Sequence, residues 1–159
     1  SLIISRIDYC NSVLYGATSA TLARLQSVLN ASAKFIARRA KYDHITCYIQ
    51  DDLHWLPITQ RIEYKLCLQA YKCLHSLASS YLTVYFELLS SGSARQGLRS
   101  ATQGMLSVPP TKSKNGGRSF AVAGPTLYNG LSHELRDSRL CLDKFKSELK
   151  TFLFKRAYF

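Results

Sequence analysis

The sequence lacks any run of about 20 apolar residues, the length that a helix needs to cross a bilayer. Its first residues, SLIISR, also lack the length and the cleavage pattern of a signal peptide. The single methionine, Met105, lies far from the start, so we expect a fragment of a longer chain. These absences predict an intracellular protein, nuclear or cytoplasmic, that is not secreted and has no membrane partner.

Cysteine is present, but it follows no pattern that a disulfide framework or a zinc site needs. The five cysteines are scattered and odd in number, which is typical of reduced thiols. A zinc knuckle needs closely spaced Cys-x-x-Cys ligands, whereas the candidates here are His44 with Cys47 and Cys73 with His75. The last two do not share a helix face. We therefore expect no metal and no cofactor.

Acidic residues are absent from residues 91–130, which carry five Lys and Arg side chains. The whole chain has 21 Lys and Arg against 10 Asp and Glu, a net charge of +11. Only residues 45–90 are near neutral, with three basic and four acidic side chains. Basic flanks favour a polyanionic partner, most commonly RNA or DNA bound through its phosphates. Solubility explains the same charge and stays open as an alternative.

Two groups of cations are the candidate phosphate-binding residues. The first lies at the C-terminal end of a predicted helix that begins near Thr18 or Ser19, where Lys34, Arg38 and Lys41 share a face and the helix dipole alone also favours cations. The second lies in the acid-free segment, partly around Gly116-Gly117, where phosphate contact and a flexible turn are both plausible interpretations. The candidates are Lys34, Arg38, Arg39, Lys41, Arg95, Arg99, Lys112, Lys114 and Arg118.

A long helix over about residues 58–77 is predicted at the centre of the fold. Pro57 suits its first turn, and apolar residues then recur in two neighbouring rows. A helix apolar over so much of its circumference is buried on more than one side. We expect Trp55 at its entrance, and leave Phe120 open as a base-stacking candidate. The predicted core residues are Trp55, Ile62, Tyr64, Leu66, Ala70, Tyr71 and Cys73.

The predicted fold class is mainly α: a helical bundle around this central helix with a small β-hairpin appendage over about 96–110. We expect a helical domain over 1–90, a basic hairpin and loop over 91–117, and a C-terminal helical segment over 118–159 that packs on the first. Within the last segment, Gly124-Pro125 is expected to interrupt a short helix.

One stretch comes close to a catalytic motif. Polymerases use Tyr-x-Asp-Asp on a hairpin to hold two metal ions. In residues 48–52, Tyr-Ile-Gln-Asp-Asp, the tyrosine is one residue too far away, and the strand context and a third carboxylate are missing. We interpret Asp51 and Asp52 as a solvated pair near a helix end. No nucleophile elbow or phosphate-cradling glycine loop occurs either, so we expect no enzymatic activity.

Several stretches together resemble the region downstream of the reverse transcriptase domain in LINE-type non-LTR retrotransposon polyproteins. Their order and spacing hold over nearly the whole chain. The stretches are SRIDYCNSVLYG (5–16), KYDHIT (41–46), LHWLPI (53–58), QRIEYK (60–65), YKCLH (71–75), SYL (80–82), RSFAVA (118–123) and FKSELKTFLF (145–154).

The resemblance implies a parent RNA-directed DNA polymerase that primes cDNA synthesis from a nick in target DNA. Its catalytic carboxylates would lie upstream, and this non-catalytic fragment would help to hold template RNA or target DNA beside that polymerase domain. The chain departs from the family at turn positions, which is typical of a degenerate copy. A structural or protein-interaction domain, or a decayed element fragment, is therefore the alternative. The departures are Cys47, Ser76, Ser79, Asn115-Gly116-Gly117, Tyr128 and Ser132.

Overall fold

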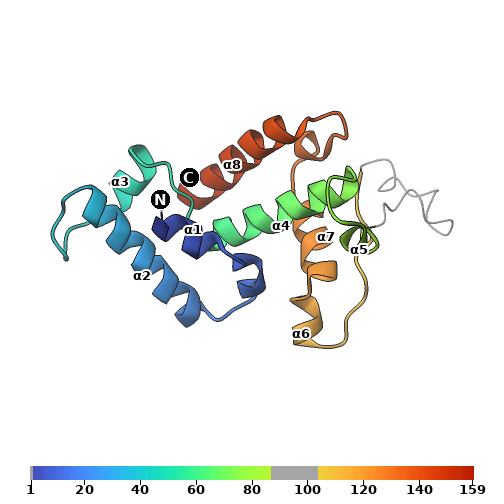
Figure 1. Ribbon diagram of the computed structural model, residues 1–159, viewed down its shortest axis with the longest axis horizontal. Coiled ribbons are helices and arrows are strands. Elements are labelled where there is room, and N and C mark those ends of the chain that lie inside the picture. The colour runs from blue at the N-terminus through green and yellow to red at the C-terminus, as the bar shows by residue number, and fades with distance from the viewer. Residues whose placement is uncertain (1, 87–103) are drawn as a thin grey trace. The chain divides into compact units, whose positions relative to one another are not determined.

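A computed structural model describes residues 2–86 and 104–159. The described chain is mainly helical, as the sequence predicts, and it contains no β-strand (Figure 1). Two 3₁₀ turns, η1 (Asn11–Leu14) and η3 (Glu134–Arg136), accompany the helices. The helices are α1 (Leu2–Asp8), α2 (Ser19–Ile36), α3 (Thr46–Asp51), α4 (Ile58–Leu74), α5 (Ser80–Thr83), α6 (Lys114–Gly117), α7 (Phe120–Asn129) and α8 (Leu142–Tyr158).

The chain divides into two compact units. Unit 1 contains residues 1–63 and 150–159, and unit 2 contains residues 64–149. Helix α4 therefore begins in unit 1 and ends in unit 2, whereas α8 begins in unit 2 and ends in unit 1. Unit 1 is made from both ends of the sequence.

The core of unit 1 joins α2 and α3. Ala33 on α2 packs with Ile45 and Ile49, and Trp55 lies partly buried against this cluster. Tyr158, at the end of α8, packs on the same cluster and donates its hydroxyl hydrogen bond to the Trp55 carbonyl at 2.8 Å. Trp55 thus lies between α3 and α4, at the entrance to the long helix.

The first turn of α4 is held by the side chains of Gln26 and Asp8, which lie far from it in the sequence. The Gln26 side-chain oxygen accepts the Ile58 backbone N–H at 3.0 Å, which satisfies one of the unpaired donors at the helix start. The Arg61 guanidinium donates to the Leu56 carbonyl at 2.9 Å and to both Asp8 carboxylate oxygens at 2.9 and 3.0 Å. The Arg61 and Asp8 side chains are only 13% and 25% exposed.

We expect the Asp8→Asn substitution to lower the free energy of unfolding by about 2 kcal/mol, because it leaves a largely buried guanidinium without its counter-charge. Urea denaturation measures this change. Asp51→Asn, at an exposed position, is the matched control and should change stability by less than about 0.5 kcal/mol. Equal midpoints for the two variants would contradict a stabilising role for the Asp8–Arg61 pair.

The core of unit 2 includes the second half of α4. The predicted core residues Leu66, Ala70, Tyr71 and Cys73 are buried there, and Tyr64 is partly buried. The remaining predicted core residue of α4, Ile62, is buried in unit 1.

Three stacked rings lie in unit 2. The Tyr71 ring stacks on Phe145 at 4.2 Å and on His75 at 4.1 Å between ring centroids. The Tyr71 hydroxyl donates a hydrogen bond to the Leu140 carbonyl. Burial lowers the pKa of the His75 imidazole, because the charged form loses its hydration.

This lowered pKa predicts a pH dependence of stability. The unfolded chain takes up a proton at His75 near pH 6.5, its ordinary pKa, and the folded chain does so only at lower pH. We therefore expect the His75 contribution to be complete above about pH 6.5 and to be lost as the pH falls through the folded pKa. Urea midpoints measured across this range should fall more steeply for the wild type than for His75→Phe, and parallel curves would contradict the prediction.

Helix α4 ends at Leu74, three residues before the predicted end, because the chain turns at Ser76. Ser76 has a left-handed backbone with φ of 55°, and the Leu77 N–H bonds back to the Lys72 carbonyl at 2.8 Å. This is the Schellman motif, whose left-handed position usually holds glycine. A non-glycine side chain there costs about 1 kcal/mol.

We expect Ser76→Gly to raise the free energy of unfolding by about 0.5–1 kcal/mol, since glycine adopts the left-handed conformation without strain. The same replacement at Ser27, exposed in the middle of α2, should lower stability by a similar amount. Thermal unfolding of the two variants measures this difference in sign. A lower melting temperature for Ser76→Gly than for the wild type would contradict strain at this turn.

Helix α7 runs without a break through Gly124-Pro125, so the predicted interruption is wrong. The N–H that Pro125 lacks leaves a gap in the helical hydrogen bonds, and the Thr126 hydroxyl donates to the Val122 carbonyl at 2.7 Å next to it. Gly124 allows close packing, because a Cβ there would lie 2.9 Å from the Phe86 ring. Phe120, left open above, packs on Phe86 with ring centroids 5.0 Å apart.

The predicted β-hairpin over about 96–110 is not supported. Residues 96–103 lie outside the described residues, and residues 104–110 contain no β-strand. The side-chain amide of Asn129, on α7, pairs with Leu106, accepting from its N–H at 2.8 Å and donating to its carbonyl at 2.9 Å.

Candidate nucleic-acid interface

The candidate site in unit 1 is the end of α2 and the loop that follows it. Helix α2 is capped at its start by Thr18, whose hydroxyl accepts the Thr21 N–H at 3.4 Å. At its other end Arg38 has a left-handed backbone with φ of 52°, and the Arg39 N–H bonds to the Lys34 carbonyl at 3.0 Å. We call this region the α2 tip, defined by Lys34, Phe35, Arg38, Arg39, Lys41 and Tyr42.

Two hydrogen bonds fix the loop of the α2 tip. The Lys34 ammonium donates to the Lys41 carbonyl at 2.5 Å, so this partly buried lysine closes the loop onto the helix. The Asp43 carboxylate accepts the Ala40 backbone N–H at 2.9 Å. Lys34 thus orders the loop, and Arg38, Arg39 and Lys41 are exposed.

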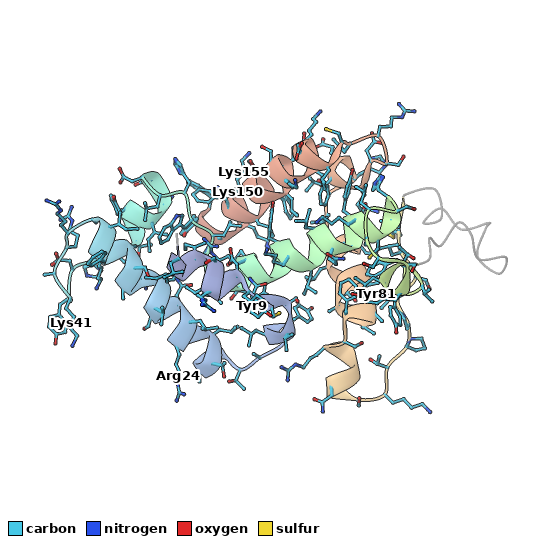
Figure 2. All side chains as sticks on the ribbon, viewed as in Figure 1. Tyr9, Arg24, Lys41, Tyr81, Lys150 and Lys155 are labelled. Atoms are coloured by element: carbon cyan, nitrogen blue, oxygen red, sulfur yellow. The ribbon has the colours of Figure 1, made fainter. Side chains whose placement is uncertain are left out.

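Two aromatic rings lie exposed beside these cations. Phe35 is 84% exposed and Tyr42 is 88% exposed. The Lys41 ammonium lies 5.5 Å from the centroid of the Tyr42 ring, and Figure 2 shows Lys41 pointing outward from this loop. Neither ring was predicted from the sequence as part of the site. The available signal was that Phe35 falls outside the apolar row of α2 and that Tyr42 stands between Lys41 and Asp43.

Residues 34–45 contain four cations and one acidic residue, Asp43, whose carboxylate accepts the Ala40 backbone N–H and forms no ion pair with these cations. Asp8, far from the α2 tip in the sequence, is held by Arg61. Within the residues that the structure describes, no ion pair involves Arg38, Arg39 or Lys41. The positive charge of the α2 tip is therefore available to an anion in solution.

The second predicted group of cations is only partly described. Lys112 and Arg118 are exposed in unit 2, on either side of the short helix α6. The Ser113 hydroxyl caps this helix by accepting the Gly116 N–H at 3.0 Å. The Lys114 side chain, Arg95 and Arg99 lie outside the described part of the chain. The two groups of cations thus belong to different compact units.

The acidic pair Asp51 and Asp52 lies exposed at the end of α3, as expected for a solvated pair. No group of three or more His, Cys, Asp and Glu residues close enough to hold a metal ion occurs in residues 2–86 and 104–159. In the same residues no helix is long and apolar enough to span a bilayer.

No family model, curated protein or solved structure matches this chain. The features of the chain that bear on function are therefore the α2 tip, the net charge and the sequence motifs quoted above. Of these, the α2 tip offers the most defined chemistry, because exposed cations and exposed aromatic rings occur together on an ordered loop.

Proposed function

We propose that this chain is a non-catalytic nucleic-acid-binding segment of a retrotransposon reverse transcriptase. The observation that carries the proposal is the α2 tip, where Arg38, Arg39 and Lys41 lie exposed beside Phe35 and Tyr42. Cations with interleaved aromatic rings match the two parts of a nucleic-acid strand, its phosphates and its bases. A net charge of +11 adds long-range attraction to any polyanion.

The cations supply affinity without reading sequence. Lysine and arginine side chains that contact phosphates release counterions, so binding weakens steeply as salt rises. Such contacts position a protein on a strand but carry no base information. This chemistry suits a segment that holds either template RNA or target DNA, whichever sequence passes.

The retrotransposon setting comes from the sequence resemblance. In such a parent polyprotein, a polymerase domain upstream copies RNA into DNA from a nick in the target, the process called target-primed reverse transcription. A basic helical segment after that domain would keep the strand near the polymerase and would need no catalytic residue of its own. The polymerase domain is then the second partner of this chain.

A protein-interaction domain is the second candidate, and exposed apolar side chains at the N-terminal end favour it. Leu2, Tyr9 and Val13 are each more than 70% exposed in the α1–η1 region of unit 1. Apolar side chains gathered in one region commonly mark a protein contact. On this alternative the cations serve solubility, and the strained turn at Ser76 is the mark of a decayed copy.

The test of the proposal is a salt series of binding measurements. We expect Arg38→Gln/Arg39→Gln/Lys41→Gln to weaken binding to both single-stranded RNA and duplex DNA. The slope of log affinity against log salt should become shallower by about two to three, since each lost phosphate contact removes about 0.7–0.9. Fluorescence anisotropy with labelled strands measures both quantities, and the RNA-to-DNA affinity ratio identifies the preferred strand.

The matched control removes the same charge from exposed positions elsewhere, in Arg24→Gln/Lys65→Gln/Arg139→Gln. A second variant, Lys112→Gln/Lys114→Gln/Arg118→Gln, tests the cations of unit 2. If the α2-tip variant and the control weaken binding equally, only the net charge of the chain matters for binding, and the interface does not lie at the α2 tip. Absence of binding by the folded wild type would favour the protein-interaction alternative.

A further inference from the structure

A second candidate site lies in unit 1, on the last turns of α8. A groove of about 330 Å³ lies there, lined by His54, Lys150, Thr151, Phe154, Lys155 and Phe159. Positions 150 and 154 lie one above the other on a helix, with 151 and 155 next to them, so α8 supplies one wall of the groove. Figure 2 shows Lys150 and Lys155 together on α8.

The ion pairs of α8 single out these two lysines. Lys144 pairs with Glu148 at 3.7 Å and Lys146 with Asp143 at 2.9 Å. Arg156 pairs with Glu63. Among the basic side chains of α8, all of which the structure describes, only Lys150 and Lys155 have no acidic partner. Both of them line the groove. An anion in the groove would supply the missing counter-charge.

The groove also has an aromatic wall held in a fixed position. The Phe154 ring packs against Tyr158 at 4.7 Å between centroids, and Tyr158 is anchored through its hydroxyl to the Trp55 carbonyl. The His54 ring meets Phe154 edge-on at 6.0 Å. Phe159, at the rim, is 91% exposed and leaves its ring open to a ligand.

His54 adds a polar group with a defined orientation. Its backbone is left-handed, with φ of 47°, and its Nδ1 lies 2.8 Å from the Gln50 carbonyl oxygen. A carbonyl oxygen only accepts hydrogen bonds, so Nδ1 carries the proton and Nε2 of the neutral ring is an acceptor. The exocyclic amino groups of adenine, cytosine and guanine are donors of the matching kind.

We propose that this groove holds one unpaired nucleotide of a single-stranded nucleic acid. The base stacks on the Phe154 and Phe159 rings, and the phosphate lies between Lys150 and Lys155. The volume is at the lower end of the range for ligand pockets, about 300–1,000 Å³, and suits a single nucleotide. A duplex does not fit, because its bases are stacked on both faces and paired at their edges.

The inference rests on the proposed function and adds a strand preference to it. The α2 tip contacts phosphates of any strand, whereas the groove requires an unpaired base. A strand bound at the groove is therefore single-stranded at that point, as a template is before it is copied.

The first experiment compares three ligands of equal length: a single-stranded RNA, the same strand with abasic sites, and the corresponding duplex. We expect Phe159→Ala to weaken binding of the intact strand by about fivefold or more, the effect of losing one stacked base, and to leave the abasic strand and the duplex unchanged. Lys150→Gln/Lys155→Gln should weaken binding of both single strands. Controls are Tyr9→Ala, another exposed aromatic residue, and Lys65→Gln/Lys144→Gln.

Two results would overturn the groove while leaving the proposed function in place. In the first, the wild type binds the intact single strand, and Phe159→Ala and Tyr9→Ala lower its affinity equally. The other is an equal loss for Phe159→Ala on intact and abasic strands, which would mean that no base is stacked. Retained folding of each variant is checked by circular dichroism, and both aromatic positions are exposed enough for truncation to leave the core intact.

A second experiment separates failure of the groove from failure of nucleic-acid binding as a whole. The folded wild type is titrated with adenosine 5′-monophosphate and, in parallel, with inorganic phosphate, while amide NMR shifts are followed. Shifts at Lys150, Phe154 and Phe159 with the nucleotide alone support the groove even if longer strands fail to bind. Equal shifts with both titrants, or none, overturn it.

Discussion

Unit 1 depends on the guanidinium of Arg61. This side chain reaches back to the Leu56 carbonyl and across to both oxygens of Asp8, so one planar group fixes α1 against the first turn of α4. Gln26 adds a third segment by accepting the Ile58 N–H from α2. Three helices distant in sequence therefore meet at one helix start, and the two ends of α2 are oriented by that junction.

The proposed interface follows from this arrangement. Helix α2 is long and well anchored, so the loop at its far end is presented by a rigid element, although the loop itself is at the surface. Lys34 closes the loop by donating to the Lys41 carbonyl, and this leaves the other cations to solution. Arg38, which follows α2, has a left-handed backbone, a conformation that glycine usually adopts at the end of a helix.

The sequence predicted the mainly helical fold and the long central helix, because apolar periodicity reports which face is buried. It missed features that depend on contacts between distant residues. Helix α7 continues through Pro125, which is buried, although a proline inside a helix removes one backbone hydrogen bond. The hydrogen bonds between the Leu106 backbone and the Asn129 side chain likewise join residues that are far apart in sequence.

The candidate site was predictable as a charge cluster but not as a surface. Lys34, predicted to bind phosphate, instead orders the loop, and the exposed ring of Phe35 was not predicted as part of the site. Composition alone does not distinguish a cation with a backbone partner from one in solution. The groove on α8 was missed for a related reason: His54 and the α8 residues are far apart in sequence, and only the fold brings them together.

The division of the chain into units has a consequence for synthesis on the ribosome. Unit 1 needs residues 150–159, which are made after the whole of unit 2. Until residues 150–159 have been synthesised, the Trp55 carbonyl therefore lacks the hydrogen bond from Tyr158. Closing this long loop is an entropic cost that falls on unit 1 alone. Unit 2 is contiguous in sequence, and of the two candidate sites in unit 1 only the groove is built with α8 residues.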